Sequence, residues 1–524
     1  MYKFLVFKDG QIPEQWPVRN GHLLGSDGNV MAADISWQDG AICVSKKEAG
    51  ICAFALQHKV SDLGELTLQT TLLPEREEPY ILALELARHR LMMLYMRLEE
   101  WSMFDLGDDH AVNVRLKKSR GLFMEALGQQ FSNPLSANHL AQESLVNAID
   151  GTEELTLAHA ELLLERRRVT HSVPKYALGC GVCLTQHDPR ILGGLQANFE
   201  ILNIPMPWKT LVPTEGEYQF QHTDPWVQWA LAAKRKIVAG PLIDFSKGQA
   251  PDWLYIWEHD YDTVRDLVYE HIKQVVNRYR GNTHVWNLMS GLNVNSQFSF
   301  SYEQIVDLVR MSALLVRKLA PKAQIMLEID QPWGEYHATN PRSIAPLRFF
   351  ELLSQSSVPF DIIGLRVFMG QARPGQYTRD MMQISGIIDH FGHQGKPLHV
   401  SFAAPSEPVN QQMLNSTPMG KQSPVQDDQC GYWRRPWSGL IQGRWLEACM
   451  HIAMSRPYVE SVSWRDVLDH PDMAMPLSGL VDDQLRPKKV FKHAIRFREY
   501  LRGVSPDSSA DASGIVPPHP AAKP

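Results

Sequence analysis

The feature that most constrains the fold is an alternation of short apolar runs with longer amphipathic stretches, which begins near Tyr176 and continues to about residue 500. The stretches 263–279 and 302–320 carry apolar residues three or four positions apart, as on one face of a helix. Short apolar runs joined by helical crossovers indicate a parallel sheet, and eight of them in about 320 residues predict a (β/α)8 barrel. The eight strand candidates are 177–184, 198–205, 236–243, 283–289, 324–329, 361–368, 397–403 and 459–464.

An open, doubly wound parallel sheet is the competing topology. That topology usually binds a nucleotide through a glycine-rich loop after its first strand. No such loop follows any of the eight strand candidates. The sequence therefore favours the closed barrel.

The part of the chain before the barrel has a different texture. Residues 1 to about 75 contain short apolar runs bounded by turn residues such as Asp9-Gly10 and Asp39-Gly40, which predict strands. Helical periodicity follows from Leu84 to Trp101 and again over 136–168. The predicted fold class is α/β, a TIM barrel preceded by a β-rich domain with a helical appendage. The predicted divisions are 1–130 for the β-rich domain, 131–172 for a helical connector, 173–502 for the barrel and 503–524 for a disordered tail.

Composition excludes several classes of protein. The chain has 524 residues and a formal net charge of −6, and this acidic balance argues against a nucleic-acid partner. Six cysteines are too few for a disulfide scaffold in a chain of this length. Lys8 and Asp9 interrupt the first apolar run, and no apolar stretch is long enough to span a membrane. We therefore expect a cytoplasmic protein with no membrane partner.

Residues from about 195 to 500 contain, in order, segments similar to those of one known family. They are WKTLVPTEGEYQF (208–220), AAKRKIVAG (232–240), HIKQVVNRYRGNTHVWN (271–287), LAPKAQIMLEID (319–330), FDIIGLRVF (360–368) and VSWRDVLDHPDMAMPLSGLVDDQLRPKKVFKHA (462–494). This part of the chain resembles glycoside hydrolase family 10, the endo-β-1,4-xylanases. The resemblance implies O-glycosyl hydrolysis in polysaccharide metabolism, a β-1,4-linked glycan as partner, and no metal or other cofactor.

Two departures from the family affect the reaction itself. Gly291 stands where the resemblance places the acid/base Glu, and Phe402 stands at the position of the nucleophile Glu. Neither side chain can transfer a proton or form a glycosyl ester, so the standard retaining mechanism cannot run at these two positions. The substrate-binding residues that the resemblance implies are Trp208, Lys209, Asn287, Arg366 and Trp464, and only Trp464 clearly retains the family's residue.

Other carboxylates offer alternative chemistry. Glu328 and Asp330 lie two positions apart on one strand and so share a face, where like charges could raise one pKa and create an acid/base pair. Asp244 and Asp466 could reach the same cavity. Alternatively, Arg366 pairs with Asp330 or Glu328 as a structural ion pair, which is the commoner arrangement.

Two further motifs carry weaker signals. Cys180 and Cys183 form a C-x-x-C motif, but their odd spacing on a strand predicts opposite faces and hence buried thiols, without a metal. Aromatic residues at 333–336, 376–377 and 432–437 fall in loops after strands, in part within a long loop at 404–440. They could stack on sugar rings or pack a long loop onto the barrel, and the sequence leaves both open.

Three functional hypotheses remain at this point. The first is a carbohydrate-active protein whose hydrolysis is lost or moved to other carboxylates such as Glu328, Asp330 and Asp466. The second is a non-catalytic glycan-binding or scaffold protein, a pseudoenzyme. The third is a barrel enzyme with unrelated chemistry, because a fold alone does not fix a function. Whether the chain is an enzyme stays open.

Overall fold

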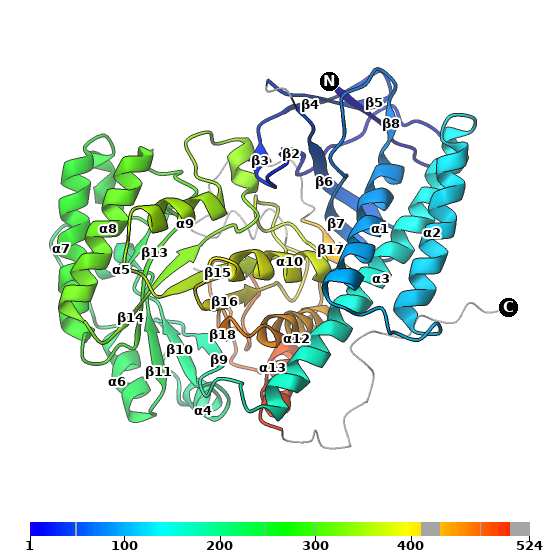
Figure 1. The fold of residues 1–524 in the computed structure, drawn as a ribbon. Coiled ribbons are helices and arrows are strands. Elements are labelled where there is room, and N and C mark those ends of the chain that lie inside the picture. The colour runs from blue at the N-terminus through cyan, green and yellow to red at the C-terminus, as the bar shows by residue number, and fades with distance from the viewer. Residues whose placement is uncertain (48–49, 247, 299, 410–429, 472, 504–524) are drawn as a thin grey trace.

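Eight parallel strands close into a barrel in the computed structural model, which describes residues 1–47, 50–246, 248–298, 300–409, 430–471 and 473–503 (Figure 1). Each strand pairs with its neighbours in the ring, and the pairs β18–β9 and β11–β13 complete the closure. The predicted barrel is therefore confirmed, and all eight strand candidates form strands. They are β9 (Leu178–Gly181), β10 (Ile201–Ile204), β11 (Lys236–Ala239), β13 (Val285–Ser290), β14 (Gln324–Ile329), β15 (Ile362–Phe368), β16 (Leu398–Ala403) and β18 (Val459–Trp464).

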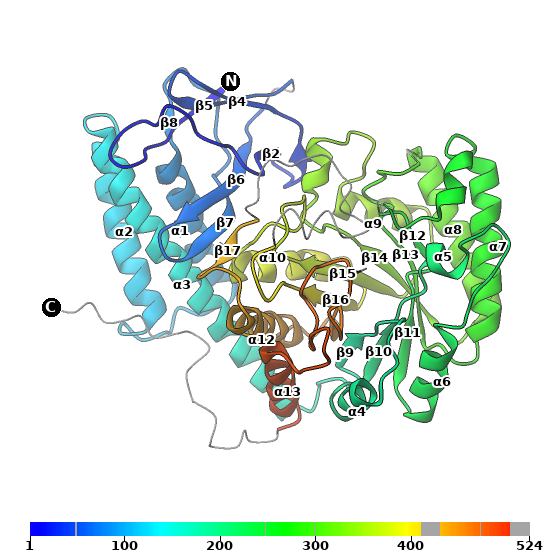
Figure 2. The same cartoon turned by 180° about the vertical axis from the view of Figure 1, so that it is seen from behind.

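Helices surround the barrel on the outside (Figures 1 and 2). Side-chain caps mark where two of these helices begin. Asp260 caps the helix that starts at Tyr261, and Ser301 forms a capping box with Gln304 at the helix that starts at Tyr302. A short strand of two residues, β12 (Ile243–Asp244), lies beside the end of β13. The helices are α4 (Pro189–Asn198), α5 (Trp208–Leu211), α6 (Asp224–Ala232), α7 (Tyr261–Tyr279), α8 (Tyr302–Leu319), α9 (Pro346–Gln355), α10 (Met381–Gly392), α12 (Gly439–Ser455) and α13 (Lys489–Leu501), with short 3-10 helices η1 (Asp252–Trp257) and η2 (Glu335–Ala338).

The interior of the barrel changes character along the strands. Near the amino ends of the strands, an apolar layer fills the interior, formed by Ile201, Val238, Val285, Met326 and Ile362. Side chains alternate between the two faces of a strand, so the interior positions that follow include polar and charged residues. The carboxyl ends of the strands, where barrel enzymes carry their active sites, are therefore the polar end.

The region before the barrel contains two small sheets, so the predicted β-rich region is present. One has the strand order β4-β5-β1-β8 and the other the order β17-β7-β6-β2-β3. In the second sheet, β17 (Tyr432–Trp433) comes from the segment after β16 and pairs antiparallel with β7. The other strands are β1 (Tyr2–Leu5), β2 (His22–Leu24), β3 (Val30–Met31), β4 (Asp34–Gln38), β5 (Ala41–Ser45), β6 (Ala53–Val60), β7 (Gly64–Gln69) and β8 (Tyr80–Ile81).

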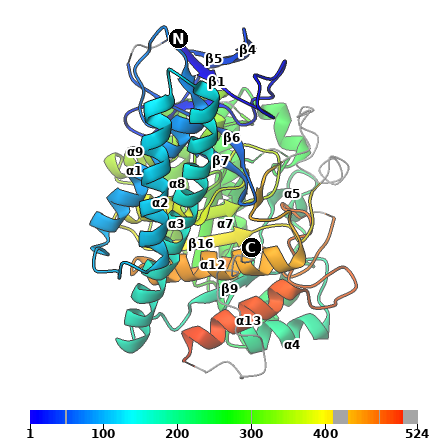
Figure 3. The same cartoon turned by 90° about the vertical axis from the view of Figure 1, so that its right-hand side faces the viewer.

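Three long helices form a layer beside these sheets (Figure 3). They are α1 (Leu82–Glu100), α2 (Ala111–Gln129) and α3 (Pro134–Val169). The periodicity of the sequence indicates α1 and α3 but does not single out α2, whose buried positions include Ser119. The domain limits proposed from the sequence stay predictions, and residues 504–524 of the predicted tail lie outside the described residues.

Buried ion pairs and hydrogen bonds join the helical layer to the barrel. Arg90 of α1 contacts Asp380 at the start of α10, with 2.6 Å between Nη2 and Oδ2. Arg167 of α3 donates to the main-chain oxygens of Met454 and Arg456, both at 2.7 Å.

In the described part of the chain, no helix is apolar over a length that would cross a bilayer.

Candidate functional site

Four charged side chains gather at the carboxyl ends of the barrel strands: Asp244, Glu328, Asp330 and Arg366, here named the strand-end cluster. The Nη2 atom of Arg366 lies 3.0 Å from an Asp244 oxygen and 3.0 Å from a Glu328 oxygen. Asn287 of β13 donates a 2.8 Å hydrogen bond to the same Glu328 oxygen. Arg366 therefore bridges two carboxylates, and the ion pair expected between Arg366 and Glu328 is confirmed.

The charges of the cluster set its protonation. Burial alone would raise the pKa values of Asp244 and Glu328, but the charge and hydrogen bonds of Arg366 hold both below their ordinary values. Burial raises the pKa of Asp330, an effect that Arg366 partly offsets and that the negative charges of Asp244 and Glu328 reinforce. The pKa shifts within the cluster therefore differ in direction: they favour the ionised form of Asp244 and Glu328 and disfavour that of Asp330.

This arrangement differs from what retaining hydrolysis requires. That reaction needs one carboxylate free to attack the sugar and one carboxylic acid facing it to protonate the leaving oxygen. Asp244 and Glu328 are both ionised, and both are bonded to Arg366. One oxygen of each carboxylate is therefore bound to a cation of the chain itself, which weakens either residue as a nucleophile or a proton donor.

Gly291 directly follows β13 and has a left-handed backbone, with φ of +75°. A Cβ atom at this position would lie 2.6 Å from the main-chain nitrogen of Ser246, closer than real Cβ atoms approach any atom. A glutamate side chain does not fit here without movement of the backbone. The assignment of Gly291 to the acid/base position stays a prediction, and the local geometry excludes a carboxylate from it.

Phe402 does not face the barrel interior, so the expectation that it fills an emptied reactive position inside the cavity is wrong in its placement. Its ring is fully buried and packs edge-on against Trp445 of α12, with 5.9 Å between ring centroids. Because side chains alternate along a strand, the neighbours Ser401 and Ala403 take the inner face of β16. Neither is a carboxylate. The alignment of Phe402 with the family's nucleophile stays a prediction.

The other residues expected to bind substrate have partners within the chain. Trp464 is fully buried, and its Nε1 donates to the Ser478 oxygen at 2.6 Å. Trp208 is buried and stacks on His271, while the exposed Lys209 pairs with Asp252 at 2.7 Å. Trp464 and Trp208 therefore present little ring surface to a sugar.

Asp466 lies on the segment after β18 and accepts a 2.9 Å hydrogen bond from Ser478 Oγ.

The segment after β18 also covers part of the barrel mouth. Met475 packs on Phe368 and Ala403, which occupy the inner ends of β15 and β16. Gln371 donates to the main-chain oxygen of Ala474 at 2.8 Å and so binds the segment after β18 to the loop after β15. The wall that a ligand at the mouth would contact is therefore already covered on this side.

Most of the aromatic residues in the loops after the barrel strands are buried and contact other parts of the chain. Tyr377, Trp433 and Trp437 are buried, and Trp433 Nε1 donates to Glu153 of α3 at 2.7 Å. These contacts support the packing interpretation over sugar stacking for the described residues of the long loop. Residues 410–429 of that loop lie outside the described residues. Trp333, in contrast, is only half-buried.

Sequence reasoning did not single out the acid of the loop after β14. Glu335 is buried and accepts hydrogen bonds from Asn20, Gly375 and Arg379, of which the first is 2.7 Å long. Asn20 belongs to the N-terminal region, so this carboxylate joins that region to two barrel loops. An isolated Glu beside aromatic residues gives no sequence signal for such a role.

The cysteines are free and buried, including Cys180 and Cys183 as predicted. Burial raises the pKa of the Cys180 thiol, which keeps it protonated and unreactive. Across the ranges that the structure describes, no three His, Cys, Asp or Glu side chains are grouped as metal ligands would be.

Comparisons with known proteins show what the barrel is similar to. Residues 187–402 match the model of glycosyl hydrolase family 10. Endo-1,4-beta-xylanase A of Xylanibacter ruminicola is 23% identical over 195 residues, which cover 35% of this chain and 51% of that protein. Endo-1,4-beta-xylanase B of Thermotoga neapolitana is 26% identical over 165 residues, which cover 31% of this chain and 46% of that protein. The chain thus spans about half the length of these curated relatives.

The solved structures that align with this chain include xylanases as well. Xylanase 10C of Cellvibrio japonicus aligns with a TM-score of 0.45 and 14% identity, over 63% of this chain and 72% of that one. A family 10 xylanase of Thermobacillus composti aligns with a TM-score of 0.45 and 17% identity, over 63% and 99%. The family match lies within the closed eight-stranded parallel barrel and leaves out β9 and β18. Over residues 187–402, the barrel of this chain is similar to glycosyl hydrolase family 10.

Proposed function

We propose that this chain is a non-catalytic member of the family, a protein that binds a neutral glycan without cleaving it. One observation carries the proposal: Arg366 bridges Asp244 and Glu328 and binds one oxygen of each carboxylate, so neither is a free nucleophile or a proton donor. Retaining hydrolysis requires two facing carboxyl groups about 5–5.5 Å apart, in opposite protonation states. The bridge favours the same ionised state in both residues.

Two further features support the loss of hydrolysis. The left-handed backbone at Gly291 leaves no room for an acid at that position. The segment after β18 covers the inner ends of β15 and β16, where a sugar would have to lie. The match to the family model and the xylanase relatives support a β-1,4-linked glycan as the partner.

The test separates binding from cleavage. The full chain is incubated with beechwood xylan, and released reducing sugar is measured beside migration of the protein in gels cast with and without xylan. We expect retardation by xylan and no release of reducing sugar. Release at a rate that scales with the protein concentration would overturn the proposal.

A second candidate function is hydrolysis relocated to Asp330. The raised pKa of Asp330 beside the two ionised carboxylates gives the cluster one potential proton donor. If this candidate holds, Asp330→Asn abolishes sugar release by the full chain. A rate that Asp330→Asn leaves unchanged would rule this residue out as the acid.

We further propose a cytoplasmic location and no nucleic-acid partner. Six free buried thiols are typical of a reducing compartment, where disulfides do not persist. The net charge of −6 disfavours binding to phosphates. Fractionation of cells that express the tagged chain tests the location.

A further inference from the structure

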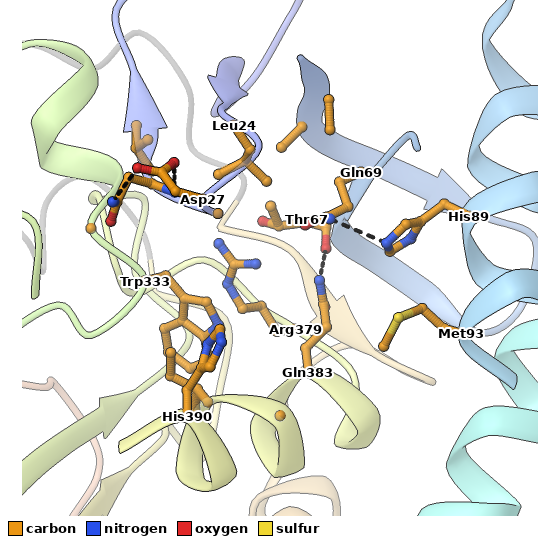
Figure 4. Close-up of a pocket in the computed structure, with 18 of the residues that line it drawn as sticks. Leu24, Asp27, Thr67, Gln69, His89, Met93, Trp333, Arg379, Gln383 and His390 are labelled. Atoms are coloured by element: carbon orange, nitrogen blue, oxygen red, sulfur yellow. Dashed lines mark hydrogen bonds between the residues drawn. The ribbon is translucent and has the colours of Figure 1, made fainter. Parts of the chain in front are cut away.

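A cleft lies between the N-terminal region and the barrel, away from the strand-end cluster. Its volume is about 620 Å³, within the range of about 300–1,000 Å³ that is common for ligand pockets. Figure 4 shows Trp333, Arg379 and His390 on one side and Gln69 and His89 on the other. The walls come from β7, α1, α10 and the loop after β14, so segments far apart in the sequence build one cavity.

Apart from Asp27, the charged side chains that line the cleft pair with residues of opposite charge. Arg90 pairs with Asp380 at 2.6 Å, Arg97 pairs with Glu100 at 2.5 Å, and Arg379 pairs with Glu335. Asp389 is in turn held by Arg456 at 2.9 Å. A charged ligand would compete with these pairs, so the lining favours a neutral ligand.

The remaining polar groups suit hydroxyl-rich ligands. Gln69 Nε2 lies 3.1 Å from His89 Nε2, and burial lowers the pKa of His89 to about 3, so its ring is neutral. The Gln69 oxygen and the second ring nitrogen of His89 carry no hydrogen bond in the described structure. Asp27 lines the same cleft and is bonded to Asn29 rather than to a cation, so its oxygens can accept from hydroxyl groups.

The cleft also offers an aromatic surface. Trp333 is half-buried, and one face of its ring is covered by Arg379, whose guanidinium carbon lies 4.7 Å from the ring centroid. The exposed part of the indole lines the cleft (Figure 4). An indole with neutral donors and acceptors opposite it is well suited to the apolar face and hydroxyl rim of a sugar ring.

From these features we propose that this cleft is a binding site for a neutral oligosaccharide, with Trp333 as the stacking surface and Gln69 with His89 as the hydrogen-bonding pair. The inference rests on the proposed function and gives it a location outside the barrel mouth. It makes the boundary between the N-terminal region and the barrel the binding surface of the protein.

The test measures binding of defined sugars to the full chain by calorimetry. The probes are xylohexaose, cellohexaose and mannohexaose, with hexagalacturonate as a charged hexamer. The variants are Trp333→Ala and Gln69→Ala, and the matched control is Tyr269→Ala, an exposed aromatic of α7 outside the cleft. We expect binding of at least one neutral hexamer, weakened about tenfold or more by each cleft variant and by less than about twofold in the control.

Melting temperatures accompany each titration, and Gln69→Ala serves as the test if Trp333→Ala does not fold. Equal affinity of the wild type and both folded cleft variants would overturn the cleft site while leaving glycan binding intact. Binding of hexagalacturonate as tight as that of the neutral sugars would overturn the ligand class. No binding of any hexamer by the wild type would also overturn the inference. Cleavage of xylan, by contrast, would overturn the proposed function and not the cleft.

Discussion

At the scale of single residues, Arg366 determines how much chemistry is open to the strand-end cluster. A buried cation that bridges two carboxylates compensates their desolvation only while all three groups are present. Removal of the cation leaves two negative charges in a site of low dielectric. The consequence is a strong dependence of stability on Arg366 and on pH.

We predict that Arg366→Met lowers the free energy of unfolding by about 3–5 kcal/mol at pH 7. Without the cation, burial raises the pKa values of Asp244 and Glu328 above those of the unfolded chain, so the loss grows as pH rises and shrinks toward pH 4. Urea unfolding at pH 7 and pH 4.5 measures this. Arg348→Met, which breaks an exposed pair with Glu351, is the matched control and should cost less than about 1 kcal/mol. An equal loss at both pH values would contradict the prediction.

Gly291 gives a second prediction at this scale. Gly291→Glu restores the side chain that the resemblance places there, but the positive φ and the closeness of Ser246 strain it. We expect a lower melting temperature, a loss of about 1–3 kcal/mol in the free energy of unfolding, and no release of sugar from xylan. A stable variant that hydrolyses xylan would refute this reading of the position.

The sequence indicates some of these residues and misses others for physical reasons. The spacing of Glu328 and Asp330 places both on one strand face, and the ion pair with Arg366 follows from the cost of isolated buried charges. The side on which Phe402 lies depends on the register of β16 against its neighbours, which one strand's pattern does not fix. Glu335 is positioned by loops from three regions, so no local pattern identifies it.

At the scale of elements, the barrel strands are predictable because each is buried on both faces and reads as a continuous apolar run. The elements that sequence reasoning misses depend on distant partners. Strand β17 has two residues and forms by pairing with β7, where Tyr432 lies opposite Glu65, a residue far earlier in the chain. The cleft has the same origin, since β7, α1 and α10 meet only in the folded molecule.

Helix α3 holds β17 in place through one carboxylate. Glu153 is buried, accepts from Trp433 Nε1 at 2.7 Å and forms an ion pair with the partly buried Arg434. We predict that Glu153→Gln speeds hydrogen exchange at the amides of β17 and β7 and lowers the free energy of unfolding by about 3–5 kcal/mol. Glu165→Gln, at the exposed end of the same helix, is the control. Unchanged exchange at β17 would show that α3 does not hold this strand.

At the scale of the whole molecule, five of the described histidines have strongly lowered pKa values and are spread over both regions. Burial lowers the pKa values of His58, His159 and His399 to about 4, and those of His89 and His271 to about 3. All five are therefore neutral in the folded protein at pH 6, while histidines of the unfolded chain begin to bind protons near pH 6.5. Acidification therefore favours the unfolded state before the carboxylates titrate.

We predict that the free energy of unfolding falls as pH decreases from 6.5 to 5, by up to about 1.4 kcal/mol per pH unit for each such histidine. Urea titrations at half-unit intervals measure the slope. His399→Asn should reduce the slope by about one proton, whereas the exposed His259→Asn should leave it unchanged. A flat profile between pH 6.5 and 5 would contradict the expected neutrality of these groups.

The sheet pairing between β17 and β7 has a consequence for how such a protein can be rearranged. The segment between β16 and α12 supplies β17, the edge strand of an N-terminal sheet. The barrel and the N-terminal region are therefore joined by the pairing of β17 with β7 as well as by the continuous chain. Neither region is a portable module. Recombination that joins this barrel to a foreign N-terminal region would leave β7 with an open, aggregation-prone edge. Viable descendants of the architecture should therefore inherit both parts together.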